Sequence, residues 1–410
     1  MPDIKNLQNK KSISLALVIP VLDEPEIFET LKSIYSCDLR DNRQIDVFVI
    51  VNHSSGANAE IKIKNSELYE MLKVFSFERS FDSPTHGKKN FKLHIIKAFD
   101  LDVRYAGVGL ARKLAMDAAV EHFTETGCSD GIIASLDADT LVATNYIDTL
   151  LSTFEGSKIS GASIYFEHPF ENEDYDVKSS IIKYELYLRY YRHALAWLQH
   201  PYSHYAVGSA FVVRARDYKA VGGMNRRQAG EDFYFIQKLI AGRRFVELNS
   251  TAVYPSARIS ERTPFGTGQA VKSIIANGGE YSVYNFNAFL PLKPFFEGVV
   301  ILFKVKSEMV DEYMKCQKEP LKSFLADSDF VDSVSELNDN TGNSEHFVKR
   351  FFDYFNAFKV LKYLNYAHSE FFEKQEVLTA ARCLFNVIGL PAPSDELDAL
   401  MMLRAIDKQC

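Results

Sequence analysis

Short, continuously apolar runs alternate with segments of helical spacing along the first third of the chain. A run that is apolar on both faces is typical of a strand buried in a parallel sheet, and apolar residues that recur every three or four positions predict a helix. The alternation predicts an α/β fold with an open, mainly parallel sheet and helices on both faces. The predicted strands are residues 13–21, 45–52, 91–99 and 131–139, and the helices between them are residues 26–37, 59–75 and 107–123.

Polar residues lie at or just beyond the carboxyl ends of three of these strands. In open α/β sheets, ligands bind beyond the carboxyl ends of the strands. Packing alone does not require six polar residues at one edge, so this edge is the predicted binding site. The six residues are Asp23, Glu24, Asn52, His53, Asp137 and Asp139.

The pattern is less regular after residue 140 and changes again near residue 285. We expect an aromatic helix over 175–200, a strand over 206–215, a helix over 230–242, a strand over 244–248 and a basic, glycine-rich loop over 257–270. Beyond about residue 285 the chain is mostly helical, and residues 326–345 are polar and acidic, which predicts a flexible loop. The predicted domains are therefore residues 1–284 and a helical C-terminal module, residues 285–410.

Composition and charge exclude some classes of protein. The chain has 410 residues and a formal net charge of −7 at pH 7, so nucleic acid is not an expected partner. The N-terminal apolar run is only as long as a strand, and no segment is long enough to span a membrane, so we expect neither a signal peptide nor a transmembrane helix. The five cysteines have no metal-binding spacing, which indicates a reducing cytoplasm. They are Cys37, Cys128, Cys316, Cys383 and Cys410.

Asp137 and Asp139 lie one residue apart at the end of the apolar run IIASL. Carboxylate oxygens suit hard divalent cations such as Mg²⁺ and Mn²⁺, and side chains at i and i+2 on a strand point the same way. The pair can share a metal, or one carboxylate can hold the metal while the other holds a ribose hydroxyl. The alternative is an ordinary strand end that faces water, but a buried strand that delivers both acids to the binding edge favours the metal site.

Glu231 and Asp232 begin the predicted helix GEDFYF. Acids are common in the first helical turn because the helix dipole favours them there. The functional alternative is a general base with a supporting acid. The small residues Gly208, Ser209 and Ala210 just upstream would let a substrate approach closely.

Two basic elements complete the candidate site. Gly107 and Gly109 open a helix whose free N–H groups could meet an anion, and Arg112 adds a cation near the acids. Arg258 and Arg262 lie in the glycine-rich loop SARISERTPFGTG. Such a loop suits closure over phosphates, although a solvated surface loop is an equally good interpretation.

Residues 13 to 270 resemble the family 2 glycosyltransferases with the GT-A fold. VIPVLDE is similar to the opening strand and nucleotide loop of that family, and VIVNHSSG lies where the family has its acidic nucleotide-binding turn. GLARKLA is similar to its glycine-to-arginine helix and SLDADT to its metal-binding DxD. VGSAFVVRARDYKAVGGMN, which leads into GEDFYF, is similar to its acceptor block and catalytic acids.

The resemblance implies a division of labour in the transfer of one sugar from a nucleoside-diphosphate sugar, UDP- or GDP-linked, to an acceptor hydroxyl. Asp139 would be the principal ligand of Mn²⁺ or Mg²⁺, with Asp137 on ribose and metal. Asp232 would be the general base in an inverting displacement, and Glu231 would orient it or the acceptor. The remaining implied nucleotide-sugar contacts are Pro20, Glu24, Asn52, His53, Arg112, Arg258 and Arg262.

Three departures from the family pattern limit this interpretation. Asn52 and His53 replace the usual acidic pair, which leaves uracil and guanine both open as the base. Lys113 stands where the family often has asparagine. No tryptophan motif of the processive enzymes follows the acid pair, which favours single-sugar addition over polymerisation.

Other functions remain open. A retaining GT-A enzyme would share these motifs, and a sugar-1-phosphate nucleotidyltransferase would want a basic loop where VIPVLDEPE is acidic. A nucleotide-sugar sensor would predict loss of the acids, yet all four are present. Surface polysaccharides, glycolipids and small molecules are all open as acceptors. The C-terminal module could form an acceptor wall, a homodimer contact or a peripheral contact at the inner face of the membrane.

Two further features near the predicted acceptor strand have structural and functional interpretations. Tyr184, Tyr187 and Tyr191 recur at helical spacing, which favours packing over a stacking wall for an acceptor. His200 and His204 could complete a metal shell, but an isolated histidine is more often structural.

Overall fold

The computed structural model describes residues 13–39, 43–78, 90–227, 230–260 and 266–409. The chain forms two compact units, each built from separate stretches. The sheet unit comprises Met1–Asn172, Ala206–Gln269 and Asp407–Cys410, and the helical unit comprises Glu173–Tyr205 and Ala270–Ile406.

One eight-stranded sheet forms the centre of the sheet unit, in the order β3-β2-β1-β4-β7-β6-β8-β5. Four of its seven pairings are parallel and three are antiparallel, which confirms the predicted mainly parallel sheet. The strands are β1 (Leu15–Val21), β2 (Gln44–Ser54), β3 (Asn90–Leu101), β4 (Ile132–Ser135), β5 (Thr140–Val142), β6 (Gly161–Phe166), β7 (Phe211–Arg214) and β8 (Phe245–Pro255).

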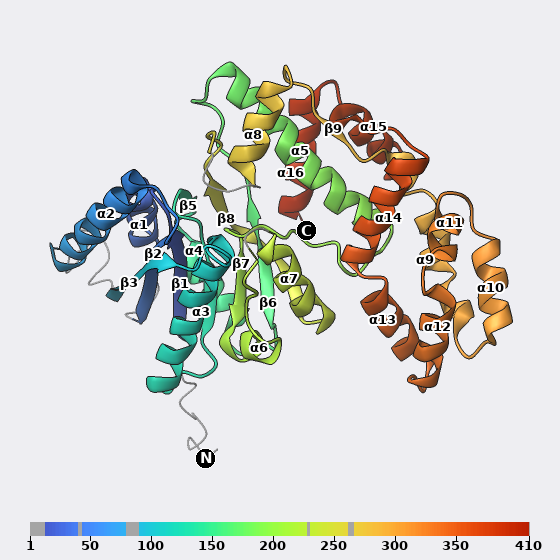
Figure 1. The fold of residues 1–410 in the computed structure, drawn as a ribbon, viewed down its shortest axis with the longest axis horizontal. Coiled ribbons are helices and arrows are strands. Elements are labelled where there is room, and N and C mark those ends of the chain that lie inside the picture. The colour runs from blue at the N-terminus through green and yellow to red at the C-terminus, as the bar shows by residue number, and fades with distance from the viewer. Residues whose placement is uncertain (1–12, 40–42, 79–89, 228–229, 261–265, 410) are drawn as a thin grey trace, which may run out of the picture. The chain divides into compact units, whose positions relative to one another are not determined.

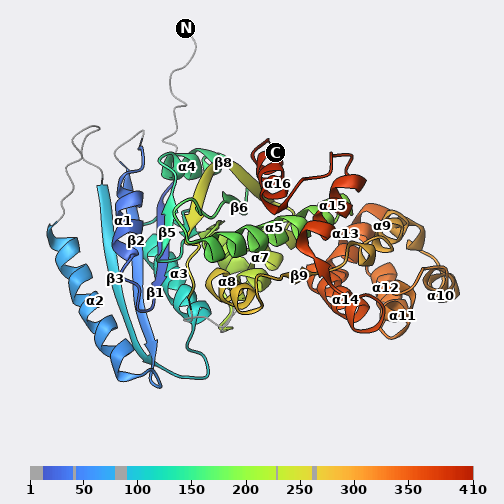
Figure 2. The ribbon, with the colours of Figure 1, turned by 90° about the horizontal axis from the view of Figure 1, so that it is seen from above.

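Helices cover both faces of this sheet, as predicted. Phe28 of α1 contacts Phe75 of α2, with ring centroids 5.3 Å apart, so α1 and α2 share a face. Right-handed crossovers place α3, which returns the chain from β3 to β4, on the other face; Figures 1 and 2 show α2 and α3 on opposite sides of β1–β3. The helices are α1 (Ile27–Tyr35), α2 (Ala59–Glu78), α3 (Val108–Glu125), α4 (Tyr146–Phe154), α6 (Ala215–Ala220) and α7 (Glu231–Ala241).

The strand order creates a switch point between β1 and β4. The chain runs outward from β1 to β2 and β3, and then crosses back to add β4 on the other side of β1. Loops beyond such neighbouring carboxyl ends diverge and leave a crevice, which is where ligands bind in open sheets. Because β7 is antiparallel to β4, with Phe211 opposite Ser135, the amino end of β7 lies at the same edge.

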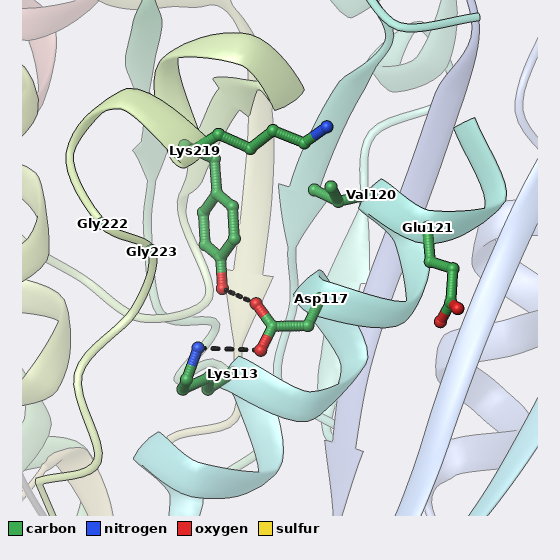
Figure 3. Close-up of a pocket in the computed structure, with 8 residues that line it drawn as sticks. Lys113, Asp117, Val120, Glu121, Lys219, Gly222 and Gly223 are labelled. Carbon is green, nitrogen blue, oxygen red and sulfur yellow. Dashed lines mark hydrogen bonds and ion pairs between the residues drawn. The ribbon is translucent and has the colours of Figure 1, made fainter. Parts of the chain in front are cut away.

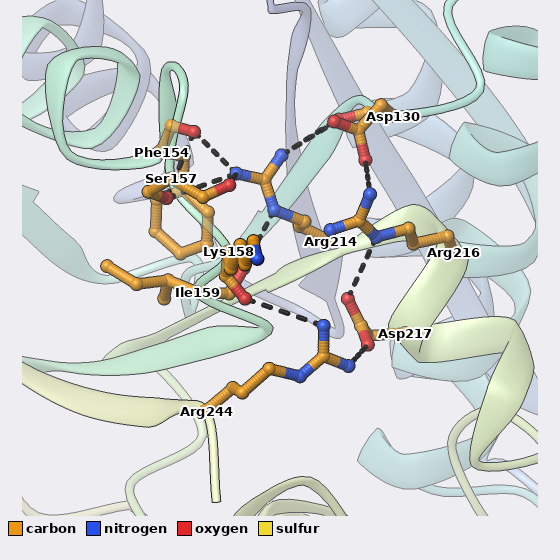
Figure 4. A network of polar contacts seen from close by, with 9 residues as sticks. All are labelled: Asp130, Phe154, Ser157, Lys158, Ile159, Arg214, Arg216, Asp217 and Arg244. Atoms are coloured by element: carbon orange, nitrogen blue, oxygen red, sulfur yellow. Dashed lines mark hydrogen bonds and ion pairs between the residues drawn. The ribbon is translucent and has the colours of Figure 1, made fainter. Parts of the chain in front are cut away.

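The opposite edge of the sheet is held by a buried arginine (Figure 4). Arg214, the last residue of β7, donates to the carbonyl oxygen of Ile159 at 2.7 Å and of Ser157 at 3.0 Å, and to the Asp130 carboxylate at 3.0 Å. These bonds tie the loop after α4 to the sheet. The side chain of Arg214 is 1% exposed, so its role is structural. It lies at the end of β7 opposite to the predicted binding edge.

The helical unit has its own aromatic core. Tyr190 in α5 is fully buried, and its hydroxyl donates to the Tyr284 carbonyl oxygen at 2.8 Å, while Tyr187 and Tyr191 pack against the same core. The packing interpretation is confirmed for Tyr187 and Tyr191. The elements are α5 (Tyr175–Trp197), α8 (Thr267–Ala276), β9 (Ser282–Val283), α9 (Leu292–Glu297), α10 (Ser307–Lys315), α11 (Leu321–Ala326), α12 (Phe330–Asp339), α13 (Ser344–Tyr354), α14 (Ala357–Glu370), β10 (Gln375–Glu376), α15 (Val377–Val387) and α16 (Glu396–Gln409), with 3-10 turns at Phe286–Ala288 and Val299–Leu302.

The flexible loop predicted over residues 326–345 is wrong. Half of that segment is helix α12, because Phe330 and Val334 are about one helical turn apart and both fully buried. Acidic and polar residues between them conceal the spacing. The division into residues 1–284 and 285–410 stays a prediction; by contacts, residues 173–205 belong with the C-terminal helices.

Within the described ranges, no helix combines the length and the hydrophobicity that crossing a membrane requires.

Candidate active site

Asp137 and Asp139 lie in the turn between β4 and β5, because β4 ends at Ser135. The strand predicted over residues 131–139 is therefore too long, and strand alternation does not orient the two acids. The turn is fixed from outside. Thr30 of α1 donates its buried hydroxyl to the Ala138 carbonyl oxygen at 2.9 Å, and Leu136 N–H donates to the Val18 carbonyl oxygen at 3.1 Å.

Arg112 joins the two acidic motifs. Its guanidinium donates to Asp137 Oδ1 at 2.6 Å and also forms an ion pair with Glu231. The Arg112 side chain is only 2% exposed. Burial alone would lower the pKa of Arg112, but Glu231 and Asp137 raise it, so the guanidinium stays charged. The structure therefore places Arg112 as the positioning residue of both acids.

Gly208 makes room for this guanidinium. A Cβ atom at position 208 would lie 2.8 Å from Arg112 Nη2 and 3.0 Å from Nη1. Gly109 of α3 has a similar role, since its Cβ would lie 2.1 Å from the Arg227 carbonyl oxygen and 3.0 Å from Glu231 Cβ. Both glycines permit close packing around Arg112 and Glu231. The sequence suggested that Gly208 leaves room for a substrate, but the Arg112 guanidinium fills the space beside it.

Glu231 and Asp232 begin α7, after Gly230 in the left-handed region with φ 66°. Glu231 is 3% exposed. Burial, and then the neighbouring Glu231 carboxylate, raise the pKa of Asp232 to about 7. A carboxyl with a pKa near neutrality can accept a proton far more effectively than an ordinary aspartate.

Arg258 forms a second ionic centre at the same edge. It follows β8, and β8 pairs with β5 so that Pro255 lies opposite Thr140. This register brings Arg258 Nη2 to 3.1 Å from Asp139 Oδ2 and into an ion pair with the buried Glu24. Arg258 Nη1 lies 2.9 Å from Glu26 Oε1.

Asn52 and His53 both lie inside β2, which extends beyond its predicted end at residue 52. Asn52 Nδ2 donates to the Val21 carbonyl oxygen at 2.8 Å. Asn65 of α2 donates to the Asn52 carbonyl oxygen at 2.8 Å and lies 3.3 Å from His53 Nδ1. Burial lowers the pKa of His53, so its imidazole is neutral at pH 7. Asn52 thus holds the carboxyl end of β1 through the Val21 carbonyl oxygen. Contact of Asn52 or His53 with a nucleoside stays a prediction.

The other predicted residues are placed as follows. Pro20 is buried in β1 opposite Ile50, and Arg262 lies outside the described residues. Lys113 pairs with Asp117 and not with the acids of the candidate site: Lys113 Nζ lies 2.7 Å from Asp117 Oδ2, and the Tyr218 hydroxyl donates to the same carboxylate at 2.7 Å. Figure 3 marks both contacts. These three residues line a separate hollow between α3 and α6.

His200, considered as a metal ligand from sequence, is structural. Its Nε2 lies 2.9 Å from the Phe355 carbonyl oxygen, and its ring packs against Phe296 at 5.2 Å. It belongs to the core of the helical unit.

Sequence reasoning missed Thr30, Asn65 and Glu26, which hold or extend the site. Thr30 and Asn65 are fully buried polar residues on predicted helices, and a polar residue on an apolar helical face is the signal that could have found them. Glu26 follows Glu24 by two residues in DEPE, so it could have been added to the acidic edge.

Carboxylates gather around Arg258 at this edge. One guanidinium nitrogen, Arg258 Nη2, contacts carboxylate oxygens of both Glu24 and Asp139. These two carboxylates therefore lie close enough together to share one positive charge. The Asp137 side chain is 42% exposed and that of Asp139 is 23% exposed. Oxygen ligands of this kind suit Mg²⁺ and Mn²⁺.

Comparison with solved structures finds similarity to TarS of S. aureus. Residues 1–349 of TarS in complex with UDP-GlcNAc match with 14% identity, covering 80% of this chain and 92% of that chain, with a TM-score of 0.40. TarS 1–349 in complex with UDP matches with 13% identity, 84% and 92% coverage and a TM-score of 0.37. No family model matches the chain, and no curated protein matches it in sequence. The function is therefore inferred from the residues of this chain.

Proposed function

We propose that this protein is a metal-dependent glycosyltransferase that moves one sugar from a nucleoside-diphosphate sugar to an acceptor hydroxyl. The observation that carries the proposal is the bridge made by Arg112, which contacts Asp137 of the DxD turn and Glu231 of the acid pair. Two acidic motifs that are 94 residues apart in sequence, counted from Asp137 to Glu231, are thus joined at the switch point of the sheet, where ligands bind.

The acceptor side of the reaction is assigned to Asp232. Its carboxylate accepts the proton of the acceptor hydroxyl as that oxygen attacks the anomeric carbon, and the bond from this carbon to the diphosphate oxygen breaks. A base with a pKa near the working pH suits this role, and the pKa of Asp232 is raised to about 7. Attack opposite the leaving group inverts the anomeric configuration.

The leaving-group side is assigned to Asp137 and Asp139. These residues would hold Mn²⁺ or Mg²⁺, with Glu24 within reach of the same point through its shared contact with Arg258. A bound divalent cation supplies neutralisation of the charge that develops on the nucleoside diphosphate. If Asp139 and Glu24 held such an ion, Arg258, which contacts both carboxylates, would be available to donate to the phosphates.

Turnover of donor sugars by matched variants tests this proposal. The full chain is incubated with UDP- and GDP-sugars, with Mn²⁺, Mg²⁺ or chelator, and release of the nucleoside diphosphate is measured. We expect Asp232→Asn to lower turnover by at least about 100-fold while donor binding, measured by calorimetry, survives. Asp139→Ala should lose the metal-dependent activity, and Asp117→Asn, in the separate hollow of Figure 3, should keep it.

Two results would contradict the assignment. Wild-type turnover in Asp232→Asn would show that Asp232 is not the general base. Equal turnover with and without chelator would show that transfer does not depend on a metal. The anomeric configuration of the product, read by NMR, separates the inverting enzyme from a retaining one. A chain that binds donors but releases no diphosphate with any acceptor would instead be a nucleotide-sugar-binding protein.

A further inference from the structure

Three residues that the proposed transfer does not use converge at the other end of α3. Oδ1 of Asp46, in β2, lies 2.7 Å from Nε2 of His94, in β3. Oδ2 of Asp46 lies 3.3 Å from Nε2 of His122, in α3. One ligand atom from each residue lies within 4.8 Å of the other two. Two imidazoles from separate elements thus face one carboxylate.

The sheet register builds this arrangement. Asp46 and Phe48 are two positions apart in β2, so both side chains point to the face that α3 covers. Phe48 lies opposite His94 in β3, and their rings stack with centroids 4.3 Å apart and planes 6° apart. His122 is near the carboxyl end of α3, and its ring lies 5.0 Å from that of His94.

Neighbouring groups hold the three residues in place. Gln44 Nε2 donates to Asp46 Oδ1 at 2.9 Å, and the ring of Phe48 fixes the plane of His94. Groups that orient ligands in this way are a regular part of protein metal sites.

We propose that Asp46, His94 and His122 form a binding site for a divalent transition-metal ion, with Zn²⁺ as the best match. Two imidazole nitrogens and one carboxylate oxygen suit Zn²⁺, whereas Mg²⁺ and Ca²⁺ prefer oxygen ligands alone. The side chains of His94 and His122 are 21% and 16% exposed. Water can therefore reach the site and fill the remaining position of a tetrahedral ion.

This site is distinct from the cation site proposed at the DxD turn. His122 follows Arg112 by ten residues on α3, which is a rise of about 15 Å along a helix. Asp46 and His94 also lie toward the amino ends of their strands, whereas the proposed active site is at the carboxyl ends. An ion here would link β2, β3 and α3, and we expect it to stabilise the fold.

Zinc binding to the metal-stripped full chain tests the proposal. Calorimetry with Zn²⁺ competing against a chelator, and the visible absorption of Co²⁺ as a probe of tetrahedral nitrogen and oxygen ligation, are measured on matched variants. His94→Gln and His122→Gln keep a hydrogen-bonding group beside Asp46 but lose the ligand nitrogen. His346→Gln removes an exposed histidine elsewhere, and Asp139→Asn removes the ligand proposed for the active site.

We expect one Zn²⁺ to bind to the wild type, to His346→Gln and to Asp139→Asn with equal affinity. His94→Gln and His122→Gln should bind it more than about 100-fold more weakly, since even the outer partners of metal ligands contribute about 10–100-fold. Circular dichroism and melting in chelator identify any variant that fails to fold. Binding of Zn²⁺ to folded His122→Gln with wild-type affinity, or no binding to the wild type, would overturn the proposal and leave a hydrogen-bonded histidine–carboxylate cluster.

Discussion

Arg112 links the two halves of the proposed chemistry through one side chain. A buried charge is tolerated when partners and hydrogen bonds compensate for its lost hydration, and here Asp137 and Glu231 provide both. Lysine could not replace it, because an ammonium group lacks the planar fork that spans two carboxylates. The positions of Asp137, proposed to serve the donor, and of Glu231, next to the proposed general base, therefore depend on one guanidinium.

Gly208→Ala tests this dependence without removing a charged group. The added Cβ would lie 2.8 Å from Arg112 Nη2, so the guanidinium must move. We expect transfer to fall on the order of 100-fold, which is what a displacement of about 1 Å can cost, with a loss of stability of about 1–3 kcal/mol from overpacking. Steady-state kinetics and urea unfolding measure the two effects.

Gly342→Ala is the matched control, because nothing lies within 4 Å of its Cβ position and the residue is exposed. It should change neither quantity. Full activity in Gly208→Ala would mean that the placement of Arg112 does not matter for transfer.

The pH dependence of transfer follows from Asp232. Burial and the Glu231 carboxylate raise the pKa of Asp232 to about 7, and the base acts only when it is deprotonated. Turnover should therefore rise through pH 7 and fall about tenfold per pH unit below it. A pH profile of kcat with saturating donor checks this, and a profile that stays flat from about pH 5 to 8 would exclude Asp232 as the base.

The same pKa predicts a stability effect of opposite direction. The folded state holds the Asp232 proton up to about pH 7, whereas the unfolded chain releases it near the ordinary value of 3.8. Between pH 3.8 and about 7 the folded state therefore binds more protons than the unfolded chain. The contribution of Asp232 to the free energy of unfolding falls over this range and is lost once the pH has risen through 7. Asp232→Asn should gain stability over the wild type at about pH 8 and gain nothing at about pH 3.

At the scale of elements, the turn that carries Asp137 and Asp139 is held by α1. The hydroxyl of Thr30 donates to the carbonyl oxygen of Ala138, between the two acids, at 2.9 Å. Thr30→Val keeps the shape of the side chain but leaves that buried carbonyl without this donor. We expect a loss of about 1 kcal/mol in unfolding free energy and weaker metal-dependent donor binding.

Thr124→Val provides the comparison, because the Thr124 hydroxyl makes an exposed bond within α3, to the Val120 carbonyl oxygen at 2.9 Å. Denaturant unfolding and donor titrations should leave this variant unchanged. Equal donor affinity in Thr30→Val and the wild type would show that the turn is fixed by other bonds.

The sequence was sufficient to predict the elements with a long apolar run or a regular helical spacing. β1, β2, β3 and α3 match the predicted segments closely, because continuous apolar runs and helical spacing report burial directly. β5 and β6 were not predicted, and β5 has only three residues, too short for a periodic signal. The contact between Arg258 and Asp139 could not be predicted either, since it depends on the pairing of β5 with β8.

At the scale of the whole molecule, the two compact units interleave in sequence. α5 belongs to the helical unit, and its buried residues Leu186 and Tyr190 share a core with Phe286 and Phe289. The sequence pattern changes near residue 285, but the change does not show that the α5 segment packs with elements that follow it by about a hundred residues. Only contacts that are distant in sequence reveal this division.

Truncation after residue 284 should therefore fail to give a well-folded protein. Removing the C-terminal helices would uncover the apolar face of α5, including Tyr190. We expect aggregation or a loosely packed state, detected by size-exclusion chromatography and dye binding. A monomeric, cooperatively unfolding fragment 1–284 with full activity would show that α5 does not need that core, and that the C-terminal helices form no part of the acceptor site.

The central claim is a nucleoside-diphosphate site that depends on metal at Asp137 and Asp139. Thermal unfolding of the full chain with UDP, GDP, ADP or CDP, in Mn²⁺ and in chelator, tests it most directly, because a ligand that binds only the folded state raises the melting temperature. We predict that UDP or GDP stabilises the wild type in Mn²⁺ but not in chelator, and that it fails to stabilise Asp139→Asn. Stabilisation by none of the four nucleotides, or equal stabilisation of Asp139→Asn, would contradict the account.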